Sequence, residues 1–594
     1  MKAPDLSKWK YEAKLEGLLF FAQIIEESLF HYTIDAYKVP ALNTRTLCQE
    51  LSETIVDVES GSIKLGAVRP IIDELNDRLV KDPAASLILG EIRDGIINSL
   101  GRNENIADTK IKAQLLENRF NKDYYYELKR LIKVFVEDVQ KKETITALTK
   151  LFLTELISLG YSPQYIYFES LDFFFRGKYP QNIDNILVLD KYFEQFTLSE
   201  NSYTAVFKVG SNFKELKDCA DILDMVIQSD PPNVQFKKTP NVVNFLIKNE
   251  KLPLFLMVKN IKGFDYFVAR ERGVEQIQLL DSLARYHVHR EDFNWSNDVL
   301  IYSDDNRSFG VYDKPISPTL KGPEQDIKQL SGLIDLTVSN VIPDKLENDS
   351  LTRFLRALLQ HNIAVKSPTP ESSLLEFWSA NEVLFLTFER GEDKITQIVR
   401  GMLPFINSEH AAKLGADLLA SFKYSNNQEI LHILDEVGEG VNDIEKCLAL
   451  VAINENEDKR NKLYKALSDH PLLKNRIYYL KTQFGSADTI YKTLIAHDKR
   501  VSWQIQRIYR TRNLIIHSGR TLPFINILVE NLHSYLDRIL ELIVEKVGVA
   551  GHQTNIEEIC AIQKLEYDAH LKLLESDKEK SCTKETFKVL LFGH

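Results

Sequence analysis

The sequence predicts a mainly α-helical protein with a small α+β domain near its middle. Apolar residues recur at helical spacing through most of residues 1–195. Short runs rich in Val, Phe and Tyr replace that pattern over residues 196–312, as is typical of strands. The helical pattern then resumes after a proline-rich segment and continues to about residue 547. We therefore expect two helical regions separated by a mixed domain.

Residues 1–195 form the predicted N-terminal helical region. Its first long helix is indicated by apolar residues three and four positions apart, namely Leu15, Leu18, Leu19, Ala22, Ile25 and Leu29. Gly160 stands where the C-terminus of a later helix belongs. Aromatic residues gather directly after it, between Tyr161 and Phe175. Aromatic rings can stack on bases, but a cluster of this kind more often packs in a core.

The middle domain, residues 196–312, should combine a small sheet with helices. Two short apolar runs flank Ser303–Arg307, a polar segment that predicts the turn of a hairpin. The expected strands are Tyr203–Val209, Leu254–Val258, Phe264–Ala269, Val299–Tyr302 and Ser308–Tyr312. Helices are expected between them, over 212–227 and 275–287.

Residues 313–345 are expected to be a linker and a connecting helix. The linker, 313–323, contains three prolines and one glycine, which favour a semi-rigid hinge. Residues 346–548 have the pattern of a helical bundle, which ends at Gly548. Residues 549–594 include a further helix and a highly charged stretch, and we expect them to form a mobile C-terminal tail.

Composition limits the possible functions. A net charge of −11 argues against a general nucleic-acid coat or a membrane-surface protein, so any contact with RNA should be local. The five cysteines are scattered, which fits reduced thiols and gives no zinc-site spacing. We expect no metal, no cofactor and no membrane partner. The sequence also lacks the apolar core of a signal peptide near its start, and we expect a soluble, cytoplasmic protein.

One predicted helix is basic although the chain as a whole is acidic. Between residues 499 and 520 there are six basic residues and no acidic residue: Lys499, Arg500, Arg507, Arg510, Arg512 and Arg520. Arg512 lies within an apolar stripe, where a guanidinium needs either a buried partner or an anionic ligand. His517 follows five residues later, just before a helix stop at Ser518–Gly519. Such a basic helix in an acidic protein indicates a site for a phosphodiester.

The motif Arg512-Asn513-x-x-x-His517, with Tyr509 before it, resembles the signature of the HEPN superfamily, and most closely its Apea-like branch. Residues 374–385, with Trp378 and Glu382 four residues apart, look like the first long helix of that branch. The resemblance covers about residues 346–548 and leaves the N-terminal half unassigned. It implies a HEPN-type helical bundle in this region.

The resemblance also implies a metal-independent endoribonuclease. His517 would take the proton of a ribose 2′-hydroxyl, because imidazoles titrate near neutrality. Arg512 would stabilise charge on the phosphate, and Asn513 would hold the phosphate or fix the imidazole tautomer. Glu382 and Tyr509 would support the site. Further contacts to RNA are expected from Lys499, Arg500, Arg507, Arg510 and Arg520.

Two protomers commonly pair with their motifs facing in this family, so a homodimer is expected. The setting that the resemblance implies is a toxin or anti-phage effector, held inactive until the N-terminal half binds a phage-derived or other trigger. Two alternatives remain at this stage. Arg512 and Glu382 could be a structural ion pair, or the domain could be a non-catalytic HEPN-fold module for interaction or RNA binding.

Overall fold

The computed structural model describes residues 5–593 apart from several short gaps. The gaps are residues 11–14, 31–32, 62, 102–104, 122, 180–181, 234–238, 248, 305–308, 314–318, 320–338, 340–344, 386–392, 426 and 468–469. Most of the described chain is helical, with one small sheet, which confirms the predicted fold class. The predicted linker 313–323 lies outside the described residues except for Asp313 and Thr319.

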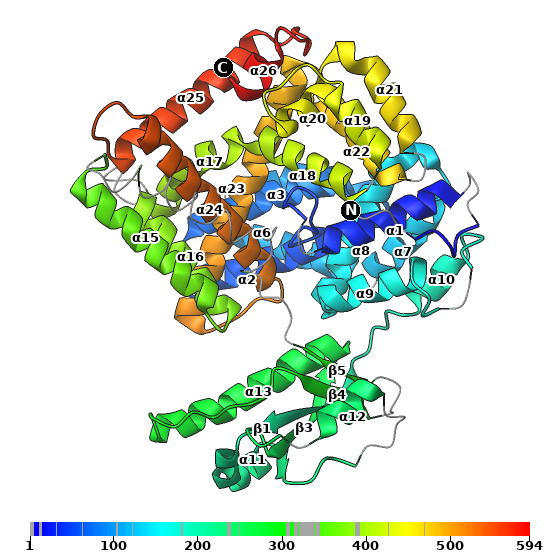
Figure 1. Ribbon diagram of the computed structural model, residues 1–594, viewed down its shortest axis with the longest axis vertical. Coiled ribbons are helices and arrows are strands. Elements are labelled where there is room, and N and C mark those ends of the chain that lie inside the picture. The colour runs from blue at the N-terminus through cyan, green and yellow to red at the C-terminus, as the bar shows by residue number, and fades with distance from the viewer. Residues whose placement is uncertain are drawn as a thin grey trace. The chain divides into compact units, whose positions relative to one another are not determined.

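The chain divides into two compact units, a helical unit and an α+β unit (Figure 1). The helical unit comprises residues 1–154, 182–186 and 318–594, and the α+β unit comprises residues 155–181 and 187–317. This division differs from the expected one in two respects. The N-terminal helices belong to the same unit as the C-terminal helices, and residues 155–181 and 187–195 belong with the sheet.

The helical unit begins with helices that are fixed by local capping. At the start of α2, Asn43 Oδ1 accepts a hydrogen bond from Thr46 N at 3.0 Å, and Thr46 Oγ1 accepts one from Asn43 N at 2.9 Å. The helices of this part are α1 (Glu16–Leu29), α2 (Thr44–Glu59), α3 (Val68–Lys81), α4 (Pro83–Leu89), α5 (Ile92–Gly101), α6 (Ile106–Phe120), α7 (Tyr124–Phe135) and α8 (Lys142–Leu159), whose last five residues belong to the α+β unit.

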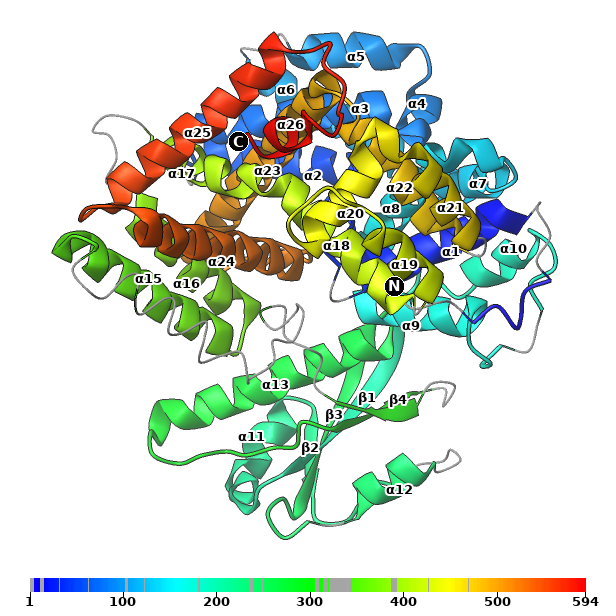
Figure 2. The same ribbon diagram turned by 45° about the horizontal axis from the view of Figure 1, so that its top comes forward.

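The remaining helices of this unit contain the sequence motif. They are α15 (Asn348–Lys366), α16 (Pro370–Phe385), α17 (Lys394–Ser408), α18 (His410–Tyr424), α19 (Gln428–Asp435), α20 (Asp443–Ala452), α21 (Glu457–Ala466), α22 (Pro471–Phe484), α23 (Ala487–Ser518), α24 (Ile525–Val549), α25 (Ile556–Ser576) and α26 (Phe587–Phe592). Helices α15, α16 and α24 lie side by side in Figures 1 and 2. None of the helices in the described part of the chain is both long enough and apolar enough to span a bilayer.

Two hydrophobic cores hold the C-terminal helices together. One core is formed chiefly by α15, α16, α17, α23 and α24, and it contains the fully buried Trp378. The other lies among α18 to α22 and the chain's last helices. Because α23 contributes Val501, Ile505 and Ile508 to the first core and Ile490 and Leu494 to the second, it is shared by both. This fixes the motif helix along most of its length.

The prediction of a mobile C-terminal tail is wrong for residues 555–592, which contain two packed helices. Helix α25 places Ile556 and Ile559 in the first core, and α26 places Phe587 and Leu590 in the second. The charged stretch ends α25 and is followed by an ordered return, in which Cys582 N donates to Gly485 O at 2.9 Å. Apolar residues on either side of the charged stretch therefore anchor this segment.

The α+β unit is built on a five-stranded antiparallel sheet with the order β2-β3-β1-β4-β5. The strands are β1 (Asn201–Val209), β2 (Met225–Gln228), β3 (Leu254–Gly263), β4 (Val299–Ser303) and β5 (Phe309–Tyr312). The predicted hairpin is confirmed, since Val299 pairs with Tyr312 and Tyr302 with Phe309. Part of its turn, residues 305–308, lies outside the described residues.

Helices cover both faces of this sheet (Figure 2). Helix α13 (Tyr266–His287) packs on one face, and α12 (Pro240–Leu246) packs on the other. Gly273 permits the close approach of α13, because a Cβ there would lie 2.9 Å from Ala205 Cβ. The unit also contains α9 (Pro163–Phe174), α10 (Val188–Phe193) and α11 (Lys217–Ile222).

The predicted strand Phe264–Ala269 is wrong, because a helix cap overrides its aromatic composition. The carboxylate of Asp265 accepts hydrogen bonds from Phe267 N and Val268 N at 2.8 and 2.9 Å and so begins α13. It also accepts from Ser162 N at 2.7 Å, which joins α9 to α13. The predicted helix 212–227 is likewise shorter than expected, since β2 begins at Met225.

Candidate functional site

The motif lies in the last two turns of α23, the longest helix of the described chain. This helix begins at a capping box formed by Ser486 and Thr489. It ends at Gly519, which adopts the left-handed conformation with φ 63° and donates from its N–H to Ile515 O at 3.0 Å. The predicted helix stop at Ser518–Gly519 is therefore confirmed.

Arg512 lies at the contact between α23 and α16, with the expected residues around it. Its Nη1 donates to Asn513 Oδ1 at 3.1 Å, and its Nη2 lies 3.9 Å from Glu382 Oε1. Trp378 Nε1 donates to the same Glu382 oxygen at 2.9 Å. The Tyr509 ring lies against Trp378 with centroids 5.5 Å apart. The structure thus brings Arg512 and Asn513 together with the predicted supporting residues, but it shows no contact between this group and His517 among the described residues.

The ion pair between Arg512 and Glu382 is loose and partly solvated. The two side chains are 26% and 23% exposed, and their closest N–O distance of 3.9 Å is beyond hydrogen-bonding range. Such a pair contributes about 0–1 kcal/mol. Trp378 donates a hydrogen bond to Glu382 Oε1 and so holds the carboxylate beside the Arg512 guanidinium without a direct hydrogen bond between the two. Arg512 keeps donors that can bind an anion.

His517 lies in the last turn of α23 and is exposed. It has no hydrogen-bond partner within the part of the chain that the structure describes. Five residues along a regular α-helix turn two side chains about 140° apart. Since α23 continues as an α-helix to Ser518, one chain does not aim Arg512 and His517 at the same point.

Arg507 and Arg510 were predicted to bind RNA, and this prediction is wrong. Both are buried, and both are neutralised by carboxylates from the N-terminal helices. Arg507 donates to Glu50 at 3.1 and 3.0 Å and to Glu74 at 2.6 Å, and Arg510 donates to Glu50 at 2.9 Å. Burial alone would raise the pKa of Glu50, but the two guanidinium groups outweigh it and lower this pKa to about 2.

The other predicted RNA contacts are exposed but dispersed. Arg520 pairs with Asp57 at 2.7 Å and remains 47% exposed. Lys499 and Arg500 are exposed, but twelve residues or more of helix separate them from Arg512, which is about 18 Å. The basic helix therefore presents separate cations rather than one continuous basic surface.

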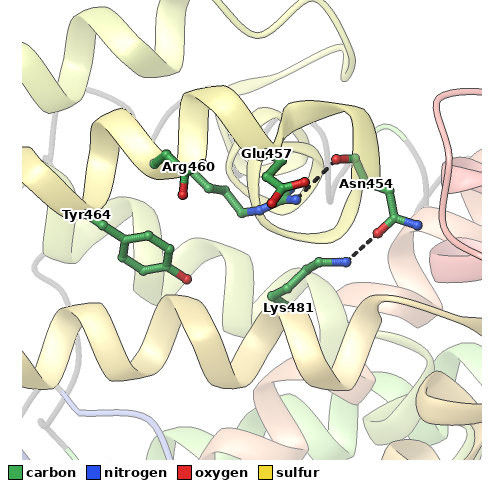
Figure 3. A pocket seen from close by; sticks show the side chains of 6 residues that line it. Asn454, Glu457, Arg460, Tyr464 and Lys481 are labelled. Atoms are coloured by element: carbon green, nitrogen blue, oxygen red, sulfur yellow. Dashed lines mark hydrogen bonds between the residues drawn. The ribbon is translucent and has the colours of Figure 1, made fainter.

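A polar pocket of about 320 Å³ lies away from the motif (Figure 3). It is lined by Asn454, Glu457, Arg460, Asn461, Tyr464 and Lys481. The buried Arg460 donates to the carbonyl oxygens of Leu450 and Asn454 at 3.1 and 3.2 Å, and Lys481 donates to Asn454 Oδ1. Because these cations already have acceptors, we assign the pocket to the support of the chain around Asn454.

Comparison of the chain with models of known protein families, with curated proteins and with solved structures gives no match. The residues of α16 and α23 are therefore the features of the chain that point to a function.

Proposed function

We propose that this protein is a metal-independent endoribonuclease of the HEPN type, with Arg512 and His517 as its catalytic residues. The proposal rests on the surroundings of these two side chains. Of the four arginines between 507 and 520, Arg512 alone has no carboxylate within hydrogen-bonding distance among the described residues. His517 is exposed and has no hydrogen-bond partner among the described residues, so its imidazole is accessible to a substrate.

The reaction would be an internal transfer within the RNA. His517 accepts the proton of the 2′-hydroxyl, and the 2′-oxygen forms a bond to the adjacent phosphorus. The bond from phosphorus to the 5′-oxygen breaks, and that oxygen takes up a proton and leaves as a 5′-hydroxyl. Arg512 stabilises the charge that develops on the phosphoryl oxygens, and Asn513 fixes the direction of the guanidinium.

A second protomer would bring an arginine and a histidine together, which a single α23 helix does not do. If the ends of two α23 helices face each other, Arg512 of one protomer lies opposite His517 of its partner. Two basic helix ends repel each other unless an anion lies between them, and an RNA phosphate meets that need. Glu382 offsets part of the same repulsion.

Cleavage should persist in EDTA and should leave 2′,3′-cyclic or 3′-phosphate ends together with 5′-hydroxyl ends. The reason is that this mechanism uses an imidazole and a guanidinium in place of a metal-bound water. End-labelling of products formed from total RNA checks the expectation. Products with 5′-phosphate ends that form only with magnesium would indicate a different nuclease, and binding of RNA without cleavage would favour the non-catalytic alternative.

The active protein should be a homodimer joined through the 346–548 region. Light scattering at micromolar concentration is expected to give twice the mass of the chain, 68.4 kDa. A monomer that retains cleavage at the same concentration would remove the composite site.

Any trigger-binding role belongs, in this proposal, to the α+β unit rather than to all of residues 1–345. The N-terminal helices share a unit with α23 and neutralise Arg507 and Arg510, so they support the fold of the motif helix. The N-terminal helices are therefore part of the same compact unit as the motif helix and not a separate unit. A fragment of residues 326–594 would lack Glu50 and Glu74 and would leave Arg507 and Arg510 without the carboxylates that pair with them.

A further inference from the structure

Three metal-binding side chains meet between α15 and α24. They are His361, on α15, and His533 and Asp537, on α24. His361 Nε2 lies 2.8 Å from Asp537 Oδ1 and 3.1 Å from His533 Nε2. His533 Nε2 in turn lies 3.3 Å from Asp537 Oδ2. All three potential ligand atoms lie within 4.8 Å of one another.

The positions of these side chains are fixed by helix geometry and by an aromatic ring. His533 and Asp537 are four residues apart, so they share one face of α24. Phe377 of α16 stacks on the His533 ring with centroids 4.8 Å apart and also contacts the His361 ring. The side chains of His361, His533 and Asp537 are 24%, 15% and 46% exposed, so an ion can reach the group from solvent.

With Asp537 ionised, no arrangement of protons makes all three close contacts of this group favourable hydrogen bonds. His361 Nε2 has either a proton or a lone pair. If it donates to Asp537 Oδ1 while His533 Nε2 donates to Asp537 Oδ2, the two imidazole N–H groups face each other, with the nitrogens 3.1 Å apart. If it accepts from His533, its lone pair faces the carboxylate of Asp537 at 2.8 Å. Asp537 has no lysine or arginine within ion-pair distance among the described residues, which leaves its charge without a fixed cation.

We propose that His361, His533 and Asp537 bind a divalent transition-metal ion of the zinc type. Two imidazoles and one carboxylate are common ligands for such an ion, which binds each at about 2.0–2.2 Å. Ligand atoms around a tetrahedral ion of this size lie about 3.3 Å from one another, close to the separations found here. The fourth position is open to water.

The site is separate from the proposed catalytic residues. Phe377 faces α15 and α24, whereas its neighbour Trp378 faces Tyr509 on α23. The ion therefore joins α15 to α24 on one side of α16, while Glu382 and Arg512 meet on another. Loss of the ion should lower the melting temperature of the helical unit, and this effect does not depend on RNA cleavage.

Zinc binding can be measured on the full chain after treatment with EDTA and desalting. Titration of Zn²⁺ against a chromophoric chelator should show about one tight site per chain in the wild type. His533→Gln and Asp537→Asn should each weaken that site by at least about 100-fold. Co²⁺ should give the visible absorption of a four-coordinate site in the wild type and lose it in both variants.

A matched control is available on the surface. His432 and Glu436 form an exposed pair at the same four-residue spacing, but no third ligand joins them among the residues that the structure describes. His432→Gln should therefore leave zinc affinity unchanged. Since Asp537 is 46% exposed, Asp537→Asn is expected to fold. If His533→Gln fails to fold, the zinc affinity of Asp537→Asn tests the proposal. The proposal is overturned if the wild-type chain binds no Zn²⁺, or if Asp537→Asn binds it as tightly as the wild type.

Discussion

His517→Ala is expected to lower the rate of RNA cleavage by about 10²–10⁴-fold, the usual contribution of a general base. The same change should alter the free energy of unfolding by no more than about 0.5 kcal/mol, because the side chain is exposed and has no described partner. Initial rates on total RNA in EDTA, measured beside a urea unfolding curve, test both expectations. Cleavage at the wild-type rate would rule His517 out as the base.

Arg512→Ala is the companion variant, and its outcome separates a catalytic role from a structural one. Loss of the phosphate contact should lower the cleavage rate by about 10²-fold or more. Arg512→Lys keeps the charge but loses the planar fork and should remain impaired. If Arg512→Ala instead lowers the melting temperature and retains cleavage, the pair with Glu382 is structural.

Glu50→Ala is expected to lower the free energy of unfolding by about 3–5 kcal/mol, because it leaves two guanidinium groups in the protein interior without their shared carboxylate. Arg507 would keep Glu74, whereas Arg510 would lose the carboxylate that pairs with it. Urea denaturation measures the change. Asp57→Ala is the control, because its partner Arg520 is 47% exposed and the pair is worth about 0–1 kcal/mol.

The same network gives a pH dependence with a defined sign. The pKa of Glu50 falls from 4.5 to about 2 in the folded protein. Its contribution to stability is therefore fully present above pH 4.5 and is lost as the pH falls toward 2. Glu50→Gln should flatten that part of the curve. An unchanged acid profile, or a small loss of stability in Glu50→Ala, would show that Arg507 and Arg510 are less dependent on this carboxylate.

The fold was predictable where its signals are local. Apolar periodicity located the long helices, and Ser518–Gly519 marked the end of α23 correctly. The C-terminal tail was missed because its charged residues dominate the composition, although Leu574 and Phe587 on either side are buried. The strand predicted at Phe264–Ala269 failed because the Asp265 cap has more influence there than the aromatic residues around it.

The candidate site was likewise predictable only where its residues are close together in the sequence. Trp378 and Glu382 are four residues apart on one helix, and Arg512 and Asn513 are neighbours, so the sequence could group them. The roles of Arg507 and Arg510 could not be predicted, because their carboxylate partners lie 433 to 460 residues away along the chain. His361 and His533, 172 residues apart, were hidden for the same reason.

Mixing two inactive variants tests the composite Arg512/His517 site most directly. Chains with His517→Ala and chains with Arg512→Ala would be co-expressed, purified as dimers and assayed on RNA in EDTA. In a two-fold dimer the mixed species has one complete pair, Arg512 from one protomer and His517 from its partner, so random mixing should restore about a quarter of wild-type cleavage. Mixed dimers that are folded but no more active than either variant alone would contradict the shared site.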